Sequence, residues 1–83
     1  MEIKTIAKRL SVTAINNRGG KITILFAPET PVTPEMLFSL YEKGGDPVKF
    51  LPEGGVELNL TGKAWGEIFK KIMEVLNRLA AML

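Results

Sequence analysis

The spacing of apolar residues alternates between the period of a helix and the period of a strand along the chain. Residues 2–10 place apolar side chains three and four positions apart, with cationic residues between them, which predicts a short amphipathic helix. Residues 34–43 and 64–82 show the same helical spacing. Thr33 before Pro34 is a favourable start for the second of these helices, because threonine can cap a helix and proline suits its first turn.

The last helix is predicted to carry a broad apolar stripe. Trp65 and Phe69 open this stripe, which continues at helical spacing to Leu83, while charged residues occupy the opposite face. A sheet is the expected partner of the stripe, so the sequence predicts that Phe69 is largely buried. The apolar end at residues 79–83 is the part most suited to an outside contact.

Two β-hairpins are predicted between the helices, over residues 12–16 with 21–26 and over residues 48–51 with 55–60. The sequence is compatible with two registers for the first hairpin. A three-residue loop that ends at Gly19 pairs Ala14 with Ile22, and glycine suits the left-handed last position of such a loop. A two-residue loop pairs Ile15 with Ile22 instead. The three-residue loop is the preferred prediction.

The second hairpin has a clearer register. A three-residue loop over residues 52–54 pairs Phe50 with Val56 and Lys49 with Glu57, so apolar residues meet on one face and opposite charges on the other. Proline first and glycine last fit a type I turn followed by a left-handed residue.

The order of elements is therefore α-β-β-α-β-β-α. Two hairpins can join into one four-stranded antiparallel sheet, which predicts an α+β fold with the helices packed on its one apolar face. Phe26 and Phe50 are assigned to that face and thus to the core. Residues 1–83 are expected to form a single domain. The first helix starts without a capping residue, which favours a fragment of a larger multidomain protein.

The amino-acid composition excludes most kinds of catalytic site. Hydrophobic residues make up 46% and charged residues 24% of the chain, as in ordinary globular proteins, and neither cysteine nor histidine is present. Thiol nucleophiles, Ser-His-Asp constellations and most zinc sites are thereby excluded. The acidic residues fall on predicted polar faces or turns, and residues 19–21 do not match a phosphate-binding loop. We therefore expect no catalytic residues, no metal site and no cofactor.

The formal net charge of +2 is unevenly distributed. Residues 1–21 hold five cationic side chains against Glu2 alone, and these are Lys4, Lys8, Arg9, Arg18 and Lys21. Clustered lysine and arginine residues can contact nucleic-acid phosphates, although no aromatic residues are interleaved with them for base stacking. No apolar run approaches the ~20 residues that span a membrane, and no secretory signal is recognisable. We expect no membrane contact and a cytoplasmic location.

One long stretch of the chain resembles a known family. Residues 19–62, GGKITILFAPETPVTPEMLFSLYEKGGDPVKFLPEGGVELNLTG, and residues 68–83, IFKKIMEVLNRLAAML, carry the resemblance. The shared features are the two glycines before the strand that ends at Phe26, the PVTP segment before a leucine-rich helix, a short second hairpin and a closing amphipathic helix. In this order they are similar to the C-terminal domain of the bacterial transcription-repair coupling factors (Mfd).

The resemblance implies a regulatory function without catalysis. Members of that family are ATP-dependent DNA translocases that act on stalled RNA polymerase and recruit nucleotide excision repair after DNA damage. Their ATPase and polymerase-binding modules lie elsewhere in the chain. The C-terminal domain contacts the UvrB-like N-terminal module of the same protein and masks the surface that binds UvrA, which is autoinhibition. The helical segments that precede this domain in the family are missing here, so no individual contact residue is transferred and the binding residues stay unknown.

The sequence therefore supports two hypotheses. The first is a protein-interaction domain whose partner is the UvrB-like module of its parent protein, with indirect links to UvrA, RNA polymerase and DNA through other domains. The alternative is a free-standing small nucleic-acid-binding domain that uses the basic N-terminal segment.

Overall fold

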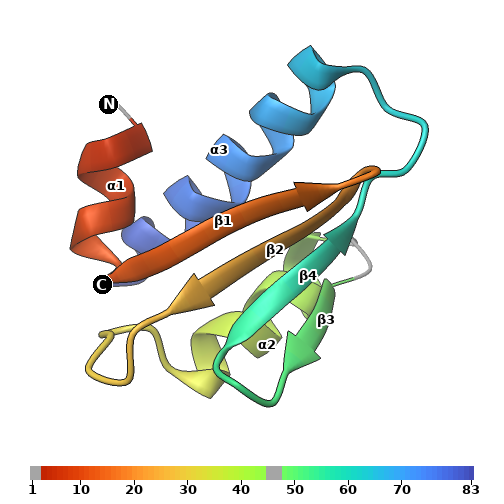
Figure 1. Ribbon diagram of the computed structural model, residues 1–83. Coiled ribbons are helices and arrows are strands. Elements are labelled where there is room, and N and C mark those ends of the chain that lie inside the picture. The colour runs from red at the N-terminus through yellow and green to blue at the C-terminus, as the bar shows by residue number, and fades with distance from the viewer. Residues whose placement is uncertain (1–2, 45–47) are drawn as a thin grey trace.

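The fold is a four-stranded antiparallel sheet with helices packed against one of its faces (Figure 1). The computed structural model describes the backbone of residues 3–44 and 48–83, and the side chains of residues 3–40 and 49–83. The elements in chain order are α1 (Ile3–Arg9), β1 (Val12–Arg18), β2 (Lys21–Phe26), α2 (Pro34–Gly44), β3 (Val48–Leu51), β4 (Gly55–Asn59) and α3 (Trp65–Ala81). This order and the α+β class are those that the sequence predicts.

The strands lie in the order β1-β2-β4-β3, so each hairpin contributes one central strand and one edge strand. Ile24 of β2 faces Val56 of β4, and Ile22 faces Leu58. These four side chains are buried on the face that the helices cover. Because side chains alternate along a strand, the residues between them lie on the opposite face, here called the open face.

The first hairpin differs from both predicted registers. Arg18 pairs with Lys21 and Ile15 with Ile24, so the loop consists of Gly19 and Gly20 alone. Both glycines have positive φ, 61° and 94°. Two-residue loops with two left-handed positions match the twist of the flanking strands, and this preference outweighs the three-residue alternative. A bulge between Val12 and Ala14 then shifts the pairing at the start of β1.

The second hairpin confirms its prediction. Phe50 pairs with Val56 and Lys49 with Glu57, and Gly54 has a φ of 94° at the end of the three-residue loop. The predicted start of α2 is also confirmed. The Thr33 side chain accepts a hydrogen bond from the Met36 backbone N–H at 3.2 Å, as expected of a helix cap.

The core lies between the sheet and the helices. α1 contributes Ile6 to it and α2 contributes Leu40, while five positions of α3 are buried, namely Ile68, Ile72, Val75, Leu76 and Leu79. These α3 positions follow helical spacing, and α3 lies against both α1 and α2. The buried side chains of the described residues form one core cluster.

Two predicted core residues are not buried. Phe69 is 42% exposed, and Trp65 one turn earlier is 63% exposed, so the prediction of a buried Phe69 is wrong. The buried stripe of α3 runs from Ile68 through Ile72 to Leu79, and in Figure 1 the first turns of α3 rise away from the sheet. Phe26 is buried as predicted, but Phe50 is 44% exposed because β3 is an edge strand.

Candidate protein-docking surface

An apolar groove runs between the start of α2 and the β3–β4 hairpin. We call it the α2–β3 groove, and its volume is about 550 Å³. Its lining residues are Pro34, Glu35, Leu37, Phe38, Phe50, Leu51, Gly54 and Gly55. Such a volume lies within the range of sites that accept small molecules or a few side chains of a partner.

Two half-exposed phenylalanines line the groove. Phe38 of α2 is 50% exposed and Phe50 of β3 is 44% exposed. Phe50 points to the helix side of the sheet, since it faces the buried Val56, yet no further strand lies beyond β3 among the described residues. Aromatic side chains that are held apart from the core in this way are typical of protein-binding sites.

The groove continues past the loop between β3 and β4. A neighbouring pocket of about 290 Å³ shares Pro34, Leu37 and Gly54 with it, and extends over Phe26 and Val32. The two pockets therefore form one apolar furrow along α2. Glu35 lines the first pocket and Glu53 lines the second, so both carboxylates lie towards the loop end of the furrow.

The predicted basic segment is split by the fold. Lys4, Lys8 and Arg9 are exposed on α1, which in Figure 1 lies beside the start of β1. Arg18 and Lys21 lie at the other end of β1, beside the hairpin loop, and face each other directly. A strand of seven residues spans about 20 Å, so the five cations do not form one patch.

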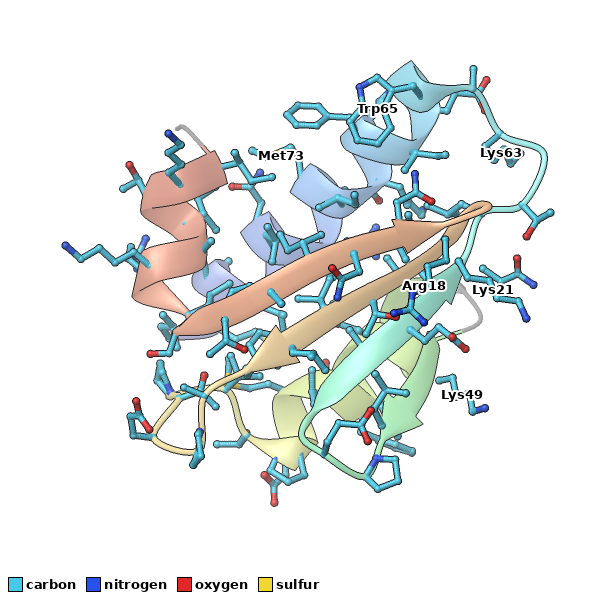
Figure 2. The ribbon with its side chains drawn as sticks, viewed as in Figure 1. Arg18, Lys21, Lys49, Lys63, Trp65 and Met73 are labelled. Atoms are coloured by element: carbon cyan, nitrogen blue, oxygen red, sulfur yellow. The ribbon has the colours of Figure 1, made fainter. Side chains whose placement is uncertain are left out.

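A further lysine, Lys49 of β3, lies on the same side of the sheet as Arg18 and Lys21. Figure 2 shows Arg18, Lys21 and Lys49 in front of the sheet, on the side away from the helices. Lys49 was already predicted to face away from Phe50. Lys49 is separated from Lys21 by β4, so their position on the same face depends on the pairing of β2 with β4, which neither hairpin pattern contains.

The open face is not well suited to nucleic-acid bases. Glu57 lies between Thr23 and Lys49 in one cross-strand row, so a carboxylate interrupts the cations. Among the aromatic residues whose side chains the structure describes, none lies on this face. Base stacking on a sheet needs such residues.

The exposed aromatic residues of α3 form a second apolar surface. The rings of Trp65 and Phe69 lie 6.3 Å apart, centre to centre, and are tilted by 47°. In Figure 2 Trp65 lies on the first turn of α3, on the far side of the sheet from the cations, and Met73 lies between α1 and α3. Neither the α2–β3 groove nor the pocket beside it includes Trp65 or Phe69, so this surface lies apart from the groove.

The described part of the chain contains no group of three or more potential metal ligands from histidine, cysteine, aspartate and glutamate. It also contains no helix with the length and apolar character to cross a membrane.

Comparisons with protein-family models, with curated proteins and with solved structures give no match to this chain.

Proposed function

We propose that this chain is a non-catalytic protein-interaction domain that regulates a transcription-repair coupling factor. Its partner is the UvrB-like N-terminal module of the parent protein, and binding masks the surface through which that module recruits UvrA. The observation that carries the proposal is the α2–β3 groove, which is apolar and is lined by two half-exposed phenylalanines. An apolar surface of this kind is suited to a protein partner.

The positions of the elements support the family resemblance. The strand that ends at Phe26, the helix that begins at Pro34, the short hairpin of β3 and β4 and the closing α3 occur in the family's order. The PVTP segment lies beside the furrow, since Val32 and Pro34 line its second pocket. The segment that carries much of the resemblance thus also shapes the proposed binding surface.

The contact is expected to be weak when the two parts are separate. Interfaces between domains of one chain are typically modest in area and rather polar. Within the parent protein, the effective concentration of one domain near the other is about millimolar, so strong intrinsic affinity is unnecessary. A weak contact can also open when the parent protein binds RNA polymerase.

A competition assay tests this function. The 83-residue chain is added in excess to the UvrB-like module of a coupling factor, and UvrA binding is measured by pull-down. We expect UvrA binding to fall as the domain saturates the module. The variant Phe38→Ser should compete poorly, whereas Lys8→Ser on α1 should compete like the unchanged chain. If saturating folded domain leaves UvrA binding unchanged, the masking function is wrong.

Nucleic-acid binding is a second candidate, favoured by the direct pairing of Arg18 with Lys21 on the open face. Like charges on facing strand positions repel each other unless an anion lies between them. Binding to phosphates should weaken with salt by a slope of about −0.9 per contact in log K against log salt. A DNA titration of the unchanged chain and of Arg18→Gln tests this candidate, and Lys4→Gln is its matched control on α1.

A further inference from the structure

The corner of the fold where the β1–β2 loop meets the connection from β4 to α3 is positively charged. We call it the loop corner, and it consists of residues 16–23 and 58–66. These two segments contain Arg18, Lys21 and Lys63 but no acidic residue. Figure 2 shows Arg18 and Lys21 on the open face, and Lys63 on the connection that follows β4. Among the described residues, none of these three cations forms an ion pair, so the corner favours an anionic ligand.

Three strands place a row of hydrogen-bond donors at the loop corner. Arg18 of β1 pairs with Lys21 of β2, and Lys21 pairs with Asn59 of β4. Residues that lie directly opposite one another in a sheet point to the same face, and neighbouring strands are about 4.8 Å apart. A guanidinium, an ammonium and an amide group therefore lie next to one another on the open face. The first two groups can only donate hydrogen bonds.

Hydrogen bonds within the connection leave Asn59 as a donor too. Its side-chain oxygen accepts hydrogen bonds from the Thr61 hydroxyl at 2.7 Å and from the Thr61 backbone N–H at 3.2 Å. The NH₂ group is thus the part of this side chain that can bind another molecule, and within the described residues it donates to no other group. The connection itself is fixed, because the Leu60 N–H donates a hydrogen bond to Gly20 O at 2.7 Å.

The next row of the open face limits the site to this corner. That row contains, in strand order, Asn16, Thr23, Glu57 and Lys49. Glu57 faces Lys49 directly and compensates its charge, so Lys49 is not part of the site. A polyanion that continued along the sheet would meet the Glu57 carboxylate. A single terminal phosphate, with up to two negative charges and three acceptor oxygens, matches two cations and one neutral donor.

We propose that the loop corner binds a phosphate monoester, whose terminal phosphate is held by Arg18, Lys21 and the NH₂ group of Asn59. Charge-assisted hydrogen bonds from the two cations give the affinity. Thr61 is a positioning residue, since it holds the Asn59 amide. Small phosphorylated molecules and phosphorylated side chains share this group. The site does not depend on the proposed protein-interaction function, and it differs from the nucleic-acid candidate because a nucleic-acid backbone presents phosphate diesters.

Phosphate titrations of the ¹⁵N-labelled 83-residue chain, followed by NMR at constant ionic strength, test the site. The probes are glycerol 2-phosphate and acetyl-phosphoserine-methylamide, and dimethyl phosphate is the diester control. We expect saturable amide shifts at residues 18–21 and 59–61 with the monoesters, and at least about fivefold weaker binding of the diester. The monoester that binds more tightly identifies the source of the phosphate. Equal binding of monoester and diester would overturn the proposal in favour of a nucleic-acid backbone.

Substitutions separate this site from general attraction to positive charge. Arg18→Gln should weaken monoester binding at least about fivefold, whereas its matched control Lys49→Gln, on the same face, should change it by less than about twofold. Asn59→Asp keeps an acceptor for Thr61 but adds a negative charge to the row, so it should weaken binding at least about tenfold in a chain that circular dichroism shows to be folded. Equal effects of Arg18→Gln and Lys49→Gln, or equally large shifts on α1, would overturn the site.

The role of Thr61 is tested by a conservative rescue. Thr61→Val removes the hydroxyl that donates to Asn59 and should weaken monoester binding severalfold, while Thr61→Ser should restore most of the affinity. A merely structural role would lower stability without this rescue of binding. Unchanged binding by Thr61→Val would overturn the role assigned to the Asn59 amide.

Discussion

Gly20 is the point at which the β1–β2 loop touches the connection from β4 to α3, and Gly20→Ala should strongly destabilise the fold. A Cβ atom at this position would lie 2.6 Å from Thr61 Cα, 2.8 Å from Thr61 N and 2.9 Å from Leu60 O. All three atoms belong to the backbone, so no side chain can rotate away. Figure 1 shows the loop and the connection side by side at one corner of the sheet.

Gly19 provides a matched control one residue away. It also has a positive φ, 61°, but a Cβ atom there would meet nothing within 4 Å. Gly19→Ala should therefore cost only the strain of a left-handed alanine, about 1 kcal/mol. Gly19→Asn should cost less, since asparagine is favoured in two-residue loops of this kind.

The magnitude for Gly20→Ala follows from three contributions. The left-handed backbone adds about 1 kcal/mol, displacement of the β4–α3 connection about 1–3 kcal/mol, and loss of the hydrogen bond from Leu60 N–H to Gly20 O about 1 kcal/mol. The total is about 3–5 kcal/mol, a large fraction of the roughly 4–12 kcal/mol expected for a domain of this size.

Urea unfolding and thermal unfolding, each followed by circular dichroism, measure this difference. Gly19→Ala should lower the melting temperature by about 4–8 °C, and Gly20→Ala by at least about 12 °C or to the point of unfolding. If both alanine variants lose the same stability within about 0.5 kcal/mol, close backbone contact at Gly20 is not a determinant of the fold, and the reasoning is refuted.

Substitutions at four further residues probe other parts of the fold by the same urea assay. Leu79→Ala removes a fully buried side chain and should cost about 2–5 kcal/mol, whereas Phe69→Ala on the exposed ridge should cost about 1 kcal/mol; similar losses would contradict the observed position of the α3 stripe. Thr33→Ala removes the cap of α2 and should cost about 1 kcal/mol, and Thr33→Ser should restore most of it. Ser11, two residues after the end of α1, has a φ of 57°, so Ser11→Gly should raise stability by about 0.5 kcal/mol, and a loss of stability would argue against strain there.

The element order and the second hairpin could be predicted because local signals agree there. Alternating apolar residues, proline at the first turn position and glycine at the last all favour the same register of β3 with β4. The first hairpin has two adjacent glycines beside Asn17, and several loops fit that sequence. The Asn17 side chain accepts a hydrogen bond from the Gly20 N–H at 2.9 Å, a contact that periodicity does not reveal.

The candidate site could not be predicted, because it depends on which strand becomes an edge. Phe50 has the alternation of a core residue, and the second hairpin alone does not indicate whether β3 or β4 pairs with β2. Pairing through β4 buries Val56 and leaves Phe50 half-exposed. The same is true of Lys49, which joins Arg18 and Lys21 on the open face only after the hairpins are joined.

The position of the groove follows from how few helices cover the sheet. α1 and α3 contact each other, and α1 also contacts β1, so together they lie towards one side of the fold. Among the described helices, α2 contacts β3. Phe38 of α2 and Phe50 of β3 both stay in contact with solvent. Each phenylalanine is about half exposed, and both line the same groove beside β3, a strand at the edge of the sheet. Apolar surface of this kind at an open sheet edge is a site at which another protein can bind, and this is the physical basis for proposing an interaction domain.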